Sequence, residues 1–133
     1  MILHVSAFYA ALTGILCVIL SVMVVRMRVA RKISIGDGGD KEMSRMVRVF
    51  GNFAEYAPLV ILVMAITETE RALAPIYLHI FGAVFILGRI AHAVGLYRTL
   101  GINAGRTIGV VATLGVILAL SIALLRGSWS SVF

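Results

Sequence analysis

Four long apolar stretches alternate with short polar segments along the chain. Each stretch has the length of roughly 20 residues that a helix needs to cross a hydrocarbon core about 30 Å thick. They lie at approximately Val5–Met27, Val47–Thr67, Ala74–Tyr97 and Thr107–Leu125. The pattern predicts an all-α integral membrane protein, a four-transmembrane-helix bundle that forms a single domain over residues 1–133.

The composition supports this interpretation and narrows the class of partners. Hydrophobic residues make up 61% of the 133 residues and charged residues only 14%, too few to cover the surface of a soluble domain of this size. The formal charge is +6, but the cations concentrate at the ends of the apolar stretches. Anionic lipid and membrane topology account for cations at such places, so we expect a lipid bilayer as partner and no nucleic acid.

The distribution of cations predicts an orientation. The segment after the first apolar stretch is strongly basic, and the segment after the third carries Arg98 and Arg106, whereas the second carries only Arg71 beside acidic residues. Because cytoplasmic segments of membrane proteins carry an excess of Lys and Arg, we expect the first and third segments in the cytoplasm and both termini outside it. The basic residues of the first segment are Arg26, Arg28, Arg31, Lys32, Lys41, Arg45 and Arg48.

Three polar residues open the second apolar stretch on one side of the expected helix. Arg48, Asn52 and Glu55 fall within about 60° of one another and rise by roughly 10 Å along the helix axis. Arg48 could be an interfacial cation and Asn52 a helix-packing group. Glu55 lies about two turns inside the stretch, where an unpaired carboxylate is costly, so it should have a partner.

The third apolar stretch offers that partner. Arg89 and His92 lie three residues apart on one face, at a depth of about 12 Å that is comparable to the depth of Glu55. Glu55 and Arg89 are therefore expected to pair, either directly or through a bound ligand, and the role of such an ion pair could be structural alone. Asn52, Tyr56 and His92 nearby favour instead a polar pocket, open to the cytosol, for a small anionic ligand. The three histidines are too scattered to form a metal site.

The motif Arg48-x-x-x-Asn52-x-x-Glu55-Tyr56-x-Pro58, at the start of the second of four spans, resembles the signature of the MAPEG family. These are membrane-associated proteins in eicosanoid and glutathione metabolism, and they include microsomal glutathione transferases and leukotriene C4 synthase. The likeness extends over the whole chain in length, span number, a basic first segment and a polar third span. Where leukotriene-synthase-like members carry tyrosines, this chain has His92 and Leu96, so it looks more like the short bacterial members.

The resemblance implies a site and an activity. Family members are trimers that bind glutathione between subunits near the cytosolic face, so the resemblance implies a homotrimer in a bacterial inner membrane. It assigns glutathione contacts to helix two and supporting roles to helix three, and it makes Arg106 the nearest candidate for the arginine that stabilises the glutathione thiolate. The implied glutathione-binding residues are Arg48, Asn52, Glu55, Tyr56, Arg89 and His92.

Three functions remain open at this point. The first is a glutathione-dependent transferase or peroxidase that acts on lipophilic small molecules at the cytosolic membrane boundary. The second is a non-catalytic MAPEG-like protein that binds lipid or glutathione. The third, a small multidrug transporter, ranks last, because such a transporter needs a carboxylate in its first span and this span has no charge before Arg26.

Overall fold

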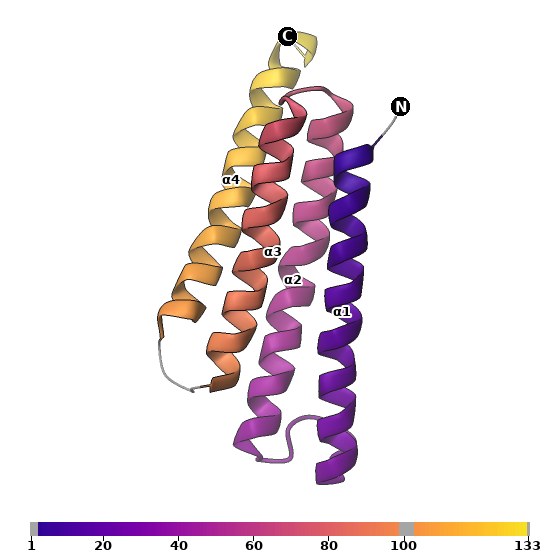
Figure 1. Cartoon of the computed structure of the whole chain (residues 1–133), viewed down its shortest axis with the longest axis vertical. Coiled ribbons are helices and arrows are strands. Elements are labelled where there is room, and N and C mark those ends of the chain that lie inside the picture. Colours follow the sequence, from indigo (N-terminus) through magenta and orange to yellow (C-terminus); the bar gives the residue numbers. More distant parts are fainter. Residues whose placement is uncertain (1–2, 99–102, 133) are drawn as a thin grey trace.

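The described residues form a bundle of four helices, which confirms the predicted all-α architecture (Figure 1). A computed structural model describes residues 3–98 and 103–132 of the 133-residue chain. All four helices are long and apolar enough to cross a membrane. They are α1 (His4–Arg31), α2 (Lys41–Thr69), α3 (Pro75–Arg98) and α4 (Ala104–Val132).

Helix α2 begins well before the apolar stretch that predicted it. Its first residue is Lys41, whereas the apolar stretch begins at Val47. Asp40 stabilises this early start, because its Oδ1 accepts hydrogen bonds from the backbone N–H groups of Glu42 at 2.8 Å and Met43 at 2.9 Å. The basic segment before the apolar stretch is therefore partly helical, and its later cations have fixed directions around the helix axis.

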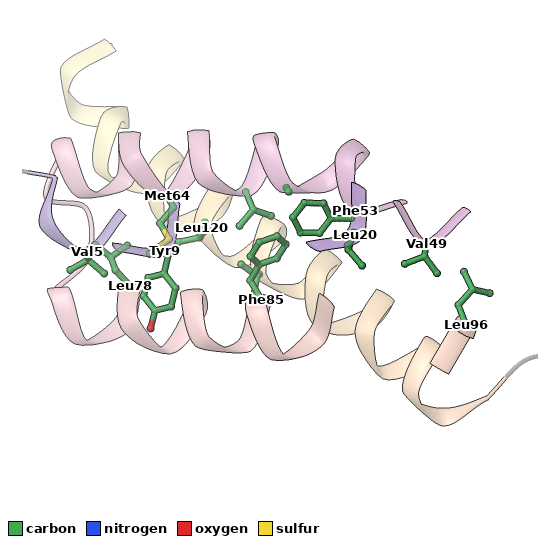
Figure 2. Close-up of a cluster of buried hydrophobic side chains, with 13 residues drawn as sticks. Val5, Tyr9, Leu20, Val49, Phe53, Met64, Leu78, Phe85, Leu96 and Leu120 are labelled. Atoms are coloured by element: carbon green, nitrogen blue, oxygen red, sulfur yellow. The ribbon is translucent and has the colours of Figure 1, made fainter. Parts of the chain in front are cut away.

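The hydrophobic core lies between the helices and extends along most of the length of the bundle. Phe53 and Met64 of α2, Phe85 of α3 and Leu120 of α4 are among the buried side chains that meet there (Figure 2). The outer faces remain apolar, and Leu87 is 66% exposed. In a bilayer such a face lies against lipid, so the membrane and the core together account for the hydrophobic composition.

Helices α3 and α4 approach each other closely through glycines. A Cβ atom on Gly109 would collide with the carbonyl oxygen of Gly88, and one on Gly95 would lie 2.7 Å from the backbone nitrogen of Arg106. Small residues allow helix backbones to come together in lipid, where packing rather than the hydrophobic effect drives association. The close approach places the backbone of α4 within reach of polar side chains on α3.

The end of the bundle that carries the N-terminus is held together by hydrogen bonds between helices. Leu3, at the N-cap of α1, has no side-chain cap. Glu68 of α2 takes that role, and its two oxygens accept from the backbone N–H groups of Val5 at 2.9 Å and Ser6 at 2.7 Å. The hydroxyl of Tyr9 donates to the carbonyl oxygen of His79 on α3 at 2.8 Å. At this end, hydrogen bonds within one chain therefore connect α1 to α2 and to α3.

Candidate functional site

The polar face predicted for α2 divides into two parts in the structure. Arg48 and Glu55 are exposed on the outside of the bundle, whereas Asn52 and Tyr56 are half-buried. Asn52 is displaced by about 40° from Arg48 around the helix axis, and this rotation turns it toward α3. Asn52 and Tyr56 thus form an inward part of the face, directed to the bundle. Arg48 and Glu55 form an outward part, directed to the bilayer.

Arg89 organises the inward part. Its side chain is only 2% exposed. Its Nη1 donates to Oδ1 of Asn52 at 2.6 Å, and its Nη2 donates to the carbonyl oxygen of Gly109 at 3.0 Å. The guanidinium carbon lies 5.9 Å from the ring centroid of Tyr56, within the range of a cation–π contact. A single side chain of α3 therefore joins α2 to α4.

The expected direct ion pair between Glu55 and Arg89 is wrong for the single chain. Arg89 donates to an amide oxygen and a backbone carbonyl, and no ion pair joins it to Glu55 in the described residues. The reason is direction rather than depth, because Arg89 enters the bundle and Glu55 projects from its outer surface. Asn52 takes the place that was assigned to the carboxylate.

His92 and Arg106 meet where α3 faces the start of α4. His92 is 4% exposed, and its Nδ1 lies 3.2 Å from the carbonyl oxygen of Arg106, a contact in which Nδ1 donates. Its Nε2 is buried and has no hydrogen-bond partner among the described residues. The backbone N–H of Arg106 donates to Oδ1 of Asn103 at 3.0 Å. The predicted thiolate-stabilising arginine is thus in the first turn of α4, with its side chain half-buried.

The outward part of the face borders a hollow of about 720 Å³. That volume falls in the range of roughly 300–1,000 Å³ that is usual for small-molecule sites. Besides Arg48 and Glu55 the hollow is lined by Asp37, whose pKa is held below its ordinary value chiefly by a hydrogen bond from the N–H of Gly39, so it is anionic at neutral pH. The remaining lining residues are Gly36, Ser44, Val47 and Gly51.

Apart from Arg48 and Glu55, none of the residues that line this hollow was identified from the sequence as a site residue. Ser44 and Gly51 lie one turn before and one turn after Arg48, on the same side of α2, and a helical wheel extended toward Lys41 would have included them. Asp37 comes from the segment before α2, which has no periodicity to place it. In the chain as described, no three His, Cys, Asp or Glu residues are grouped as a metal site would require.

Comparison with known proteins identifies the family. The model of the MAPEG family matches residues 6–126, which is most of the chain. The chain belongs to the MAPEG family. It is also 38% identical over 96 residues to the inner membrane protein YecN of Escherichia coli strain K12, an alignment that covers 72% of each chain. The corresponding protein of Escherichia coli O6:H1 matches equally well. The four apolar helices and these relatives indicate a multi-pass inner membrane protein.

Proposed function

We propose that this protein binds glutathione at the hollow beside Arg48 and acts as a glutathione-dependent transferase or peroxidase. The observation that carries the proposal is that a cation and a carboxylate, Arg48 and Glu55, line one hollow on the exposed face of a membrane helix. The carboxylate has no partner in the described chain, and such a group inside an apolar span marks a functional site by default. The MAPEG family includes glutathione-dependent transferases, and lipophilic electrophiles reach this face through the bilayer.

The charges of glutathione match those of the hollow. Glutathione carries two carboxylates and one ammonium group. Arg48 would donate charge-assisted hydrogen bonds to a carboxylate, and Glu55 would accept from the ammonium. Because Oδ1 of Asn52 already accepts from Arg89, the amide nitrogen of Asn52 is the part left to donate to the peptide of the ligand. Tyr56 and His92 remain proposed ligand contacts on the inward side, although neither lines the hollow in the described chain.

The chemistry requires a glutathione thiolate. A free thiol has a pKa of about 8.5, and a nearby guanidinium favours its ionised form. Arg106 would supply that guanidinium from the first turn of α4. The thiolate then attacks an electrophilic carbon, forms a carbon–sulfur bond and expels the leaving group with its electron pair. With a hydroperoxide, two glutathione molecules are oxidised to the disulfide while the peroxide is reduced to an alcohol and water.

We further propose a homotrimer with one hollow at each boundary between subunits. A carboxylate exposed to hydrocarbon is expensive, and a neighbouring subunit would remove Glu55 from lipid and close the hollow. Chemical cross-linking in membranes should give a ladder that ends at three chains. A monomer in detergent that kept full glutathione affinity would contradict this assembly.

The orientation follows from the cation distribution, with the first and third segments in the cytoplasm and both termini outside it. In a Cys17→Ser background, a cysteine placed at Asp37 should be labelled only from the cytoplasmic side. A cysteine placed at Thr69 should be labelled only from the opposite side. The reverse pattern would place the proposed hollow outside the cytoplasm, away from the cytosolic pool of glutathione.

Calorimetry tests the glutathione proposal. The wild type should bind glutathione, whereas Arg48→Ala and Asn52→Ala should each weaken binding about ten- to a hundredfold, since each removes a hydrogen bond to a charged ligand. Arg26→Ala is the matched control, because Arg26 is an exposed arginine of α1 outside the hollow. Absence of binding to the wild type at millimolar glutathione, or wild-type affinity in both variants, would reject the proposal.

A non-catalytic MAPEG-like protein that binds lipid or glutathione is the second candidate. Leu96, at a position where leukotriene-synthase-like members carry a tyrosine, is 4% exposed and belongs to the hydrophobic core. The chain therefore places a packing residue there in place of a polar one. Glutathione binding without conjugation of a generic electrophile, and without peroxide reduction, would favour this candidate over the enzyme.

A further inference from the structure

A second hollow, of about 410 Å³, lies between α1, α2 and α3 at the end of the bundle that carries the first connecting segment. Its floor includes Leu20, Met46 and Val49, each at most 4% exposed. Its rim includes Ile90 and Val94, which are 43% and 44% exposed. Figure 1 shows α1 and α3 separating toward this end. The hollow is therefore apolar inside and open sideways, in the direction from which lipid would enter.

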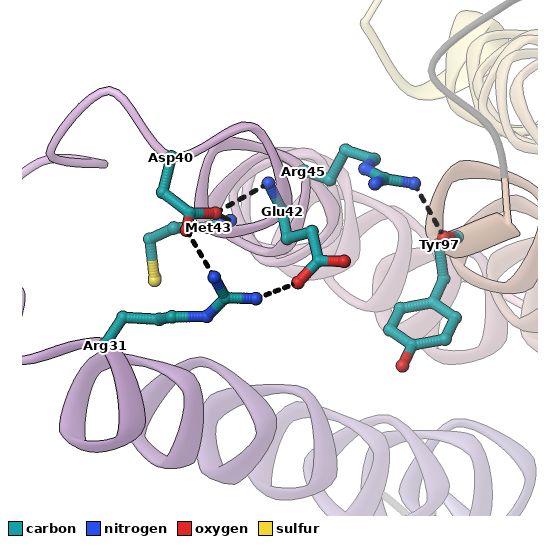
Figure 3. Close-up of polar contacts among 6 residues, drawn as sticks. All are labelled: Arg31, Asp40, Glu42, Met43, Arg45 and Tyr97. Atoms are coloured by element: carbon teal, nitrogen blue, oxygen red, sulfur yellow. Dashed lines mark hydrogen bonds and ion pairs between the residues drawn. The ribbon is translucent and has the colours of Figure 1, made fainter.

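The mouth of this hollow is charged. A neighbouring hollow of about 380 Å³ shares Tyr97 and Arg98 with it and is also lined by Arg45 and Glu42. Arg45 donates from Nη1 to the carbonyl oxygen of Tyr97 at 3.1 Å (Figure 3). Its Nε is buried without a hydrogen-bond partner in the described part of the chain. Arg45 thus carries a donor that no described residue satisfies.

Glu42, which lines the mouth, and Asp40, the N-cap of α2, are already paired with another arginine. Arg31 bridges Asp40 at 2.9 Å and also contacts Glu42 (Figure 3). With Arg45 and Arg98 the group has three guanidinium groups and two carboxylates, a net charge of +1. A single negative charge on a ligand would neutralise this group. Because Arg31 already pairs with the two carboxylates, Arg45 and Arg98 are the arginines that could bind the ligand.

We propose that these two neighbouring hollows form one groove, and that this groove is a binding site for an anionic phospholipid of the adjacent leaflet. One acyl chain occupies the apolar hollow, and the phosphate lies between Arg45 and Arg98. Charge complementarity favours a headgroup with one net negative charge, and basic pockets between membrane helices are known to bind anionic headgroups. The volume accommodates a single chain, and the open side leaves the second chain in the bilayer. Because neither Arg48 nor Glu55 lines this groove, the proposal does not depend on glutathione binding.

Native mass spectrometry of the full-length protein in a non-ionic detergent provides the test. Phosphatidylglycerol should bind more tightly than phosphatidylcholine with the same acyl chains. Arg98→Gln should weaken phosphatidylglycerol roughly tenfold, since it removes a charge-assisted bond at an exposed position where the fold is not at stake. Ala93→Phe should fill the apolar hollow and weaken both lipids, because Ala93 is one of its lining residues.

Matched variants distinguish lipid binding at this site from non-specific attraction of lipid to the charge or the apolar surface of the protein. Arg26→Gln removes an exposed arginine and Ala11→Phe enlarges an exposed alanine, both on α1 and both outside the groove, so each should bind lipid as the wild type does. Equal affinity for the two lipids, or equal weakening by Arg98→Gln and Arg26→Gln, would overturn the proposal. An Ala93→Phe protein that keeps its lipid but changes its number of subunits would also overturn it, and would show that a second copy covers the groove.

Discussion

Two glutamates on α2 have opposite environments. Glu68, near the end of the helix, is half-buried, and both of its oxygens accept hydrogen bonds from the backbone at the start of α1. Glu55, in the middle of the same helix, is exposed and has no hydrogen bond or ion pair within the described chain. The chain itself supplies hydrogen-bond partners for the carboxylate of Glu68, whereas it leaves the carboxylate of Glu55 exposed to other molecules.

The more costly position is the one left unsatisfied. Glu68 lies at a helix end, where water and headgroups are near, whereas Glu55 lies about 12 Å inside the apolar stretch of α2. An internal partner at the less costly position and none at the more costly one favours a partner for Glu55 from outside the chain. A ligand, a neighbouring subunit or both would supply it, and this reasoning links the proposed glutathione site to the proposed trimer.

The strongest test of the contrast is Glu55→Gln. Loss of the acceptor charge for the glutathione ammonium should weaken glutathione binding about ten- to a hundredfold, measured by calorimetry. The thermal stability in detergent should not fall, because the substitution removes a charge that the chain does not pair. Glu68→Gln is the matched control, and it should keep glutathione affinity. A loss of affinity in both variants, or in Glu68→Gln alone, would show that the two positions do not differ in the proposed way.

A double-mutant cycle sharpens the comparison at Arg89. The variants Arg89→Met and Asn52→Ala should be coupled by about 1 kcal/mol or more in unfolding free energy, because Arg89 donates to Oδ1 of Asn52 at 2.6 Å. The pair Arg89→Met and Glu55→Gln should be additive within about 0.5 kcal/mol in the absence of glutathione. Coupling in the second pair but not in the first would instead support the ion pair between Glu55 and Arg89 that the sequence suggested.

The fold could be predicted from the sequence, whereas the partners inside the site could not. Apolar length alone indicates four membrane helices, and the spacing of Arg48 and Glu55 places both on one side of α2. The same spacing cannot show where α3 packs, so the contact of Asn52 with Arg89 was not foreseen. The contact with Gly109 depends on the close approach of α3 and α4, which is a tertiary property.

The role of Glu68 was also missed, although the sequence holds an indirect signal. The start of α1 offers Leu3 at the N-cap, a residue that cannot accept a hydrogen bond through its side chain. The first N–H groups of a helix at the membrane surface still need acceptors, so one had to come from elsewhere in the chain. Pattern reasoning along a single segment cannot say which distant carboxylate provides it.

Removal of the Glu68 carboxylate should have a moderate effect on stability and none on ligand binding. Glu68→Ala leaves the N–H groups of Val5 and Ser6 without their acceptors, and the loss of a helix cap costs typically about 1 kcal/mol. Thermal unfolding in detergent should therefore begin at a lower temperature than for the wild type, while calorimetry with glutathione is unchanged. Unaltered stability would mean that water replaces the carboxylate at no cost.

The smallest expected effect concerns Asp40, the carboxylate that caps α2 as Glu68 caps α1. The N–H of Met43 is the main cause that holds the pKa of Asp40 below its ordinary value of 3.8. A lowered pKa means that the cap stabilises the native state above the unfolded pKa and loses this effect as the pH falls through the folded value. The amide resonances of Glu42 and Met43 should shift in that acidic range in the wild type. They should shift less in Asp40→Asn, because Asn accepts the same hydrogen bonds without a charge of its own to titrate. Identical acid responses of the two proteins would show that this cap does not hold the start of α2.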